Sequence, residues 1–231
     1  MDVKGDYQCF YSAQTLSRLA VGTGIGATVA NTSAYAELLE AFDAATGSGG
    51  GRTDLLHSCR CLGDGKCILP VYVTAWAAGE LLETTGVDNS AGDWSQRCLR
   101  ATAVGVPPLL FLQNATGGSR PGETSHGSHW RPFQDDNGFS GHSFMSAVPF
   151  LTAAAMCDEP VTKSLCYAGS VVGPLSRIHD HAHYPSQAAM GWWLAYLAVA
   201  AVNDQPESPA SVQFVPCGPQ GETGAFMEFR Y

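Results

Sequence analysis

The chain has 231 residues, of which 45% are hydrophobic and 14% charged. This length and composition argue against a disordered protein and fit one compact domain over residues 1–231 with a single sizeable core. The net charge of −9, with only 12 Lys and Arg, argues against a nucleic-acid surface, because phosphate backbones demand clustered basic residues.

The alternation of apolar stretches and turn-forming residues predicts a mostly helical bundle. Helices are expected over residues 11–29, 34–45, 70–84, 95–112, 140–156 and 185–202. Pro107-Pro108 does not fit inside a regular helix, so the fourth of these must kink or restart there. Residues 113–139 form a long loop rich in Gly, Ser, Pro and His, and a loop of this length is usually functional. The tail, residues 212–231, is compatible with a small hairpin, so the predicted fold class is all-α with a C-terminal hairpin.

Two features of the chain bear on its location. The apolar stretches 144–156 and 192–202 are far shorter than the roughly 20 residues that cross a bilayer, so we expect no transmembrane segment and a soluble bundle. The start, Met-Asp-Val-Lys-Gly-Asp, has no apolar core behind it and is not a signal peptide. If the protein is exported, we expect that a leader has been removed.

Eight cysteines suit an oxidising compartment and predict disulfides. The local pairs that we expect lie among Cys59, Cys61 and Cys67, and between Cys157 and Cys166. The first group does not have the spacing of a zinc knuckle, so no metal site is expected there. The cysteines therefore predict an extracytoplasmic protein, periplasmic or secreted.

Two short segments carry the candidate site: Phe139-Ser140-Gly141-His142, and the stretch from Ser176-Arg177 to His183. Helices that begin near Ser140 and near Pro185 would aim unpaired backbone N–H groups at an anion. Arg120 and Arg177 can each grip two oxygens of a phosphate-like group. These residue types predict a phosphate or vanadate cradle with two histidines.

The order and spacing of these residues resemble the type 2 phosphatidic acid phosphatase (PAP2) superfamily, which also contains class A acid phosphatases and vanadium haloperoxidases. The pattern of that family is Lys, six residues, Arg-Pro; then Pro-Ser-Gly-His; then Ser-Arg, five residues, His, three residues, Asp. In this chain the pattern runs through Gln113, Arg120-Pro121, Phe139-Ser140-Gly141-His142, Ser176-Arg177, His183 and Gln187.

The resemblance implies a role for each matching residue. His183 would be the nucleophile that takes the phosphoryl group, His142 would give a proton to the leaving oxygen, and Gln187 would orient the nucleophile. The phosphate group would be bound by Arg120, Arg177, Ser140, Gly141 and Gln113. The scheme requires no cofactor and no metal, and vanadate would act as an inhibitor.

The chain departs from the family pattern at two polar positions. Gln113 stands where the family has lysine, and the loss of that cation removes an interaction worth about 1.5–3 kcal/mol. Gln187 stands where the family has aspartate, and a comparable carboxylate-to-amide change in the serine-protease triad costs about 10⁴ in turnover. Asp180 or a nearby Glu is a candidate to compensate for the missing carboxylate.

Other basic residues near the motifs have simpler interpretations. Arg131-Pro132 leaves only the six residues 133–138 before Phe139, so Arg120 is the better match and Arg131 is an auxiliary cation or a loop ion pair. The run of His179, His181 and His183 does not form a zinc pair, because Pro185 places the helix start after it. The loop histidines, His126 and His129, are expected to face solvent or to bond to the loop.

The sequence thus predicts a phosphomonoesterase, a hydrolase of the acid-phosphatase or lipid-phosphatase kind, acting through a phosphohistidine on a phospholipid-like or small soluble phosphate ester. A first alternative is a vanadate-dependent haloperoxidase, in which vanadate on His183 would be the prosthetic group. A second is a non-catalytic phosphate-binding descendant of the family.

Overall fold

The computed structural model of the protein describes residues 3–46, 56–86, 89–203, 212–216 and 223–227. In chain order its elements are α1 (Val3–Phe10), α2 (Ala13–Ala30), α3 (Ala34–Thr46), the 3₁₀ helix η1 (Cys59–Gly63), α5 (Gly65–Glu83), α6 (Ser90–Thr116), α7 (Gly141–Met156), α8 (Pro160–Ser170), α9 (Val172–His179), α10 (Pro185–Asn203), β1 (Val212–Pro216) and β2 (Thr223–Met227). The bundle confirms the predicted all-α fold class. The two strands pair antiparallel, which confirms the small hairpin in the tail.

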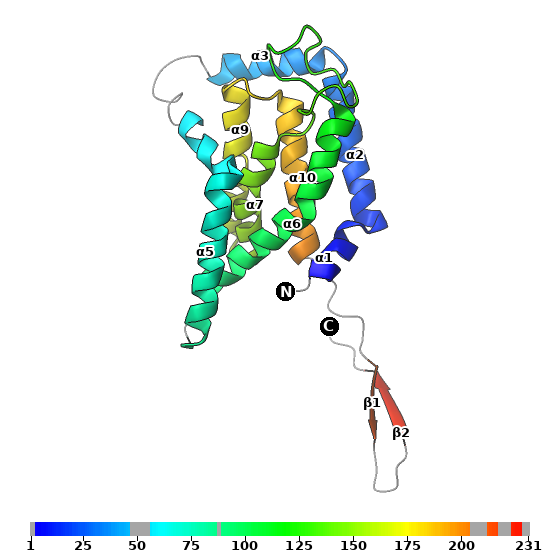
Figure 1. The fold of residues 1–231 in the computed structure, drawn as a ribbon, viewed down its shortest axis with the longest axis vertical. Helices are drawn as coiled ribbons and strands as arrows, with labels where there is room; N and C mark the ends of the chain where they lie inside the picture. Colours follow the sequence, from blue (N-terminus) through cyan, green and yellow to red (C-terminus); the bar gives the residue numbers. More distant parts are fainter. Residues whose placement is uncertain (1–2, 47–55, 87–88, 204–211, 217–222, 228–231) are drawn as a thin grey trace.

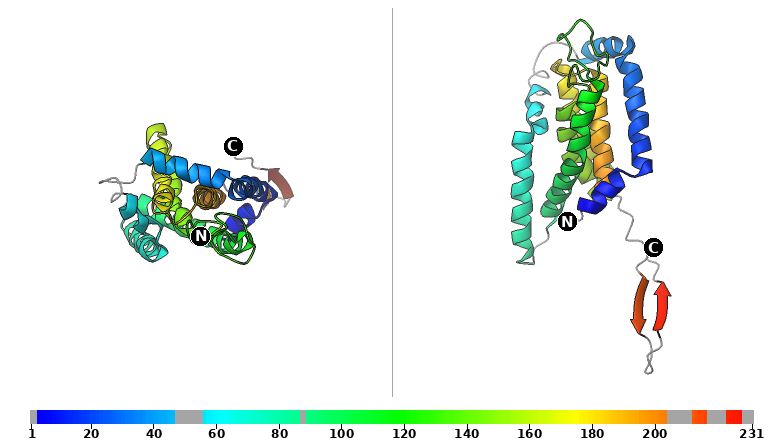
Figure 2. Two further views of the ribbon diagram at one scale, coloured as in Figure 1. Left: turned by 90° about the horizontal axis from the view of Figure 1, so that it is seen from above. Right: turned by 45° about the vertical axis from the view of Figure 1, so that its right-hand side comes forward.

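Helices α7 and α10 lie in the centre of the bundle, with α5 and α2 on opposite sides and α3 across one end (Figures 1 and 2). The core is built mainly from these central helices: Phe144 and Leu151 of α7, and Leu194 and Leu197 of α10, are almost completely buried. Val104 of α6 belongs to the same cluster. Burial of large apolar side chains on both central helices fixes the position of their N-termini, near which the predicted motifs lie.

Helix α6 is a single helix from Ser90 to Thr116 that contains Pro107-Pro108, so of the two predicted outcomes, a kink or a restart, the restart does not occur. Pro108 is buried on the face of α6 that packs against the bundle. Packing of that face stabilises the helix across the hydrogen bonds that the two prolines cannot make.

The segment after α7 also differs from the expectation. Between Cys157 and Cys166, where a disulfide was expected, helix α8 begins, with Glu159 as its N-cap and Pro160 at its first turn. The Glu159 carboxylate accepts from the Val161 N–H at 3.0 Å and from the Thr162 N–H at 2.6 Å. A carboxylate before proline is a helix-start signal that the cysteine-based interpretation overlooked.

The cysteines in the described part of the chain are free, which corrects the prediction of disulfides for them. They are Cys9, Cys59, Cys61, Cys67, Cys98, Cys157 and Cys166. An even number of cysteines at short spacings along the chain does not by itself bring their sulfur atoms together. Here η1 carries Cys59 and Cys61, whereas Cys67 lies in the first turn of α5. The eighth cysteine, Cys217, lies outside the described residues.

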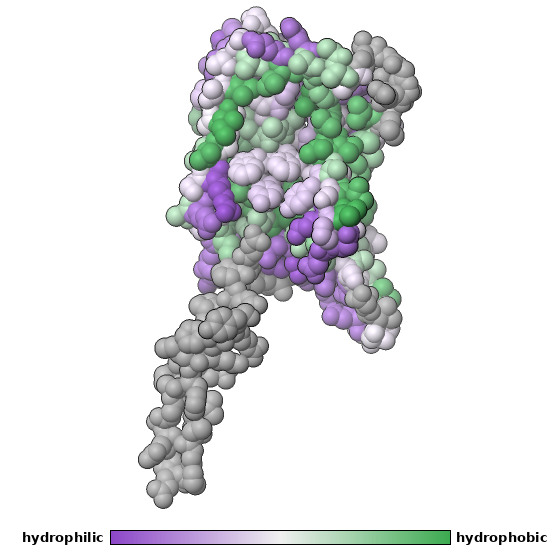
Figure 3. Space-filling view, turned by 180° about the vertical axis from the view of Figure 1, so that it is seen from behind, coloured by the Kyte–Doolittle hydropathy of each residue, from purple (hydrophilic) through white to green (hydrophobic). Residues whose placement is uncertain are grey.

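The surface of the bundle alternates between hydrophobic and hydrophilic regions on the face shown in Figure 3. Exposed large hydrophobic side chains include Val21 and Ile25 of α2 and Leu165 of α8. Among the helices of the described residues, none combines the length and apolar character needed to span a bilayer.

The long loop between α6 and α7 is fastened back onto itself at the end of the bundle near α3. Gly117 ends α6 with a φ of 62°, and a Cβ there would lie 1.8 Å from the Arg131 carbonyl oxygen, so only glycine fits. The Gly118 carbonyl accepts from the Asn137 N–H at 2.9 Å. These contacts hold Arg120 in a defined place although it lies in a loop.

Candidate active site

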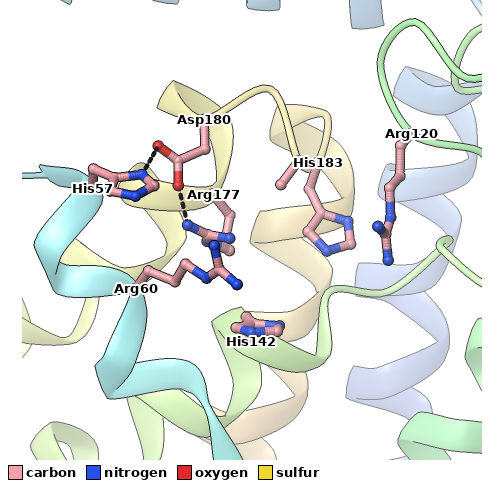
Figure 4. Close-up of a pocket in the computed structure, with 8 residues that line it drawn as sticks. His57, Arg60, Arg120, His142, Arg177, Asp180 and His183 are labelled. Carbon is pink, nitrogen blue, oxygen red and sulfur yellow. Dashed lines mark hydrogen bonds and ion pairs between the residues drawn. The ribbon is translucent and has the colours of Figure 1, made fainter. Parts of the chain in front are cut away.

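A cavity of about 420 Å³ opens where η1, α7, α9, α10 and the long loop meet (Figure 4). Its lining residues are His57, Arg60, Arg120, His142, Arg177, Asp180, Ala182 and His183. The structure therefore brings four of the predicted site residues, His183, His142, Arg120 and Arg177, into one pocket.

His183 lies just before α10 and is 6% exposed. Its Nδ1 atom is 3.1 Å from Oε1 of Gln187, which lies in the first turn of α10. The same Oε1 accepts from the Tyr184 N–H at 3.1 Å, and the Gln187 Nε2 donates to the Ser119 carbonyl at 2.8 Å. Because these two backbone bonds fix Oε1 as an acceptor, Nδ1 carries the hydrogen and Nε2 keeps its lone pair.

Burial, partly opposed by the bond to Gln187 and assisted by the charge of Arg120, lowers the pKa of His183 to about 4. The imidazole is therefore neutral at pH 7. Gln187 is completely buried, and its bond to Nδ1 favours a single tautomer of the ring. An amide does this without supplying a negative charge.

His142 stands in the first turn of α7, across the cavity from His183 (Figure 4). Burial lowers its pKa from the ordinary value of 6.5; the charge of Arg177 adds to this shift, and Asp64 opposes it. A nearby Gly63 packs directly on this residue, since a Cβ on Gly63 would lie 2.5 Å from the His142 carbonyl oxygen. The His142 ring is thus held at the cavity wall, and its protonated form gives up a proton more readily than an ordinary histidine does.

Two arginines face the cavity from opposite sides (Figure 4). Arg177 on α9 is 6% exposed and forms an ion pair with Asp180. Its Nε is buried and has no hydrogen-bond partner among the described residues. Arg120 donates from Nε to Asn137 Oδ1 at 2.8 Å, which leaves its terminal nitrogens toward the cavity. Such guanidinium groups suit a phosphate-like anion.

Three predicted phosphate-binding residues are not among those that line the cavity. Ser140 is completely buried, and its Oγ caps α7 by accepting from the Ser143 N–H at 3.2 Å. Gln113 donates its side-chain amide to the Phe139 carbonyl at 2.9 Å. Gly141 lies beside it, since a Cβ there would be 3.3 Å from Gln113 Nε2. These residues shape the start of α7, behind the cavity wall.

His57 and Arg60 line the cavity although the sequence did not predict them there, and Asp180 does not hold the position expected of it. His57 and Arg60 lie in the cysteine-rich connection, whose interpretation rested on its thiols. Asp180 contacts Arg177 and accepts from His57 Nδ1 at 3.3 Å, and no bond joins it to His183 among the described contacts. It therefore does not take the place of the family aspartate. The sequence offered one signal for Arg60, which is that it is one of only 12 Lys and Arg residues in an acidic chain.

The remaining histidines point in different directions. His181 has a φ of 51° and places Nε2 3.2 Å from Asp43 of α3, whereas His179 Nδ1 lies 3.7 Å from Asp180. In the long loop, the ring of His129 packs edge-on against Tyr35 with centroids 5.5 Å apart. His179 and His181 therefore contact different partners and do not form one site.

Residues 101–208 match the model of the PAP2 superfamily, and this match includes every residue of the predicted pattern from 113 to 187. No curated protein and no solved structure matches the chain. The superfamily generally comprises phosphatases and haloperoxidases. The family match, the helical fold and the order of the motif residues agree, and together they support membership of the chain in the PAP2 superfamily.

Proposed function

We propose that the protein is a phosphomonoesterase that works through a phosphohistidine at His183. The observation that carries the proposal is the neutral His183 ring, whose Nδ1–H is held by Gln187 while Nε2 remains unprotonated at an arginine-lined cavity. A neutral, oriented imidazole is what nucleophilic attack requires.

In the first step the His183 Nε2 lone pair forms a bond to phosphorus as the bond from phosphorus to the ester oxygen breaks. His142 in its protonated form gives its proton to that leaving oxygen, and the alcohol departs. Arg120 and Arg177 stabilise the negative charge on the three equatorial oxygens during the in-line transfer.

In the second step a water molecule attacks the phosphorus of the phosphohistidine and the bond to Nε2 breaks. His142, now neutral, accepts a proton from the water, which returns both histidines to their starting protonation states. Inorganic phosphate then leaves the cavity. Gln187 keeps its bond to Nδ1 throughout, so the same nitrogen is presented in each cycle.

The test is hydrolysis of an aryl phosphate by the wild type and by His183→Ala, together with trapping of the labelled phosphoenzyme. We expect turnover that vanadate inhibits and an acid-labile, base-stable phosphoenzyme, both lost in His183→Ala. Phosphate release that persists in the alanine variant would refute the nucleophile assignment. Bromination with vanadate and peroxide, without phosphate release, would replace the proposal with the haloperoxidase alternative.

A further inference from the structure

The cavity contains a third arginine that lies outside the region matching the family. Arg60 belongs to η1, and the family match begins at residue 101. Its side chain lines the cavity and points between Arg177 and His142 (Figure 4). The position that carries the family's lysine, by contrast, holds Gln113, whose amide is bonded to the Phe139 carbonyl.

The η1 segment is anchored on both sides of Arg60. Before it, His57 Nδ1 lies 3.3 Å from Asp180 Oδ1. After it, Gly63 packs so tightly on the His142 backbone that a Cβ would approach the carbonyl oxygen to 2.5 Å. Asp64 then caps α5 by accepting from the Lys66 N–H at 3.0 Å. Arg60 is therefore presented to the cavity by a segment docked on α7 and α9.

The charges of the cavity are not balanced. Three guanidinium groups, those of Arg60, Arg120 and Arg177, line it together with the single carboxylate of Asp180. Asp180 is engaged by Arg177 and His57, and within the described residues no carboxylate pairs with Arg60. Two guanidinium charges therefore have no carboxylate to balance them among the residues that line the cavity. This number equals the two negative charges of a phosphate monoester near neutral pH and exceeds the single negative charge of a diester.

The charge of Arg60 also acts on the other members of the site. It contributes, after burial and other larger effects, to the lowered pKa of His142 and to that of Arg177. The three residues line the same cavity, so the Arg60 guanidinium lies beside the space that a bound phosphate would occupy. Arg60 is itself exposed, so it reaches solvent and ligand without a role in the core.

We propose that Arg60 is a phosphate-binding residue that supplies, from η1, the cation that Gln113 does not. The inference rests on the proposed function only in taking a phosphate group as the ligand. It adds a specificity: the cavity selects monoesters because their second charge is met by Arg60.

The experiment measures the dissociation constant of inorganic phosphate by calorimetry for the wild type, Arg60→Gln and Arg60→Lys. A charge-assisted hydrogen bond corresponds to about 10- to 100-fold in affinity, so Arg60→Gln should bind phosphate at least tenfold more weakly. Arg60→Lys should recover part of this loss. Arg131→Gln is the matched control, because it removes an exposed arginine that does not line the cavity, and it should bind as the wild type does.

The outcomes keep this inference separate from the proposed function. If Arg60→Gln binds phosphate as tightly as the wild type, the inference fails while hydrolysis can still support the proposed function. If the wild type binds phosphate through Arg60 but never turns over, the inference stands and the proposed function fails. A wild type that neither binds nor hydrolyses overturns both.

Discussion

Replacing Gln187 by methionine tests whether the buried amide orients the nucleophile. Methionine has a similar length and fits the completely buried position, but it can neither accept from His183 Nδ1 and the Tyr184 N–H nor donate to the Ser119 carbonyl. Each buried polar group left without a partner costs at least about 1 kcal/mol, so the three should lower the free energy of unfolding by about 3 kcal/mol. For a chain of this size that corresponds to a fall in Tm of about 6–12 °C.

The same change should act on catalysis separately from stability. Without an acceptor at Nδ1, the His183 ring can place its proton on Nε2 and turn in its site, and a comparable tautomer error costs about 10⁴ in turnover. We therefore expect phosphoenzyme formation from an aryl phosphate, measured well below the Tm of the variant, to slow by about 10²- to 10⁴-fold. A Gln187→Met protein with wild-type Tm and wild-type rate would refute the hydrogen-bond assignment around His183.

Two further predictions concern the pair of histidines. Turnover needs neutral His183, whose pKa is about 4, and protonated His142, whose pKa lies below 6.5. The rate of hydrolysis should therefore fall as pH drops through about 4 and fall again as pH rises toward neutrality. A pH optimum above 7 would contradict these roles. His142→Ala should slow hydrolysis of an alkyl phosphate by about 10²- to 10⁴-fold but affect an aryl phosphate with a good leaving group much less. Equal losses on the two substrates would show that His142 does not protonate the leaving oxygen.

Local signals in the sequence were sufficient for the central elements. Ser140 before Gly141 predicted the start of α7, and Pro185 predicted the start of α10, because N-caps and first-turn prolines act within a few residues of the chain. Helix α8 carried an equally local signal at Glu159 that the expectation of a disulfide obscured. For α6 the prolines predicted a kink or a restart, and packing in the bundle keeps the segment as one helix.

The sequence by itself predicted the family match and singled out two histidines and two arginines as site candidates, because these residues stand at fixed spacings within short motifs. Only the tertiary structure decided that Gln113 bonds to Phe139 behind the cavity wall, and that Arg60 enters the cavity from a segment far from the motifs. The physical reason is that charge balance in a pocket depends on which side chains the packing of η1 against α7 and α9 brings together. That packing is set by contacts such as Gly63 on His142, which no spacing along the chain reveals.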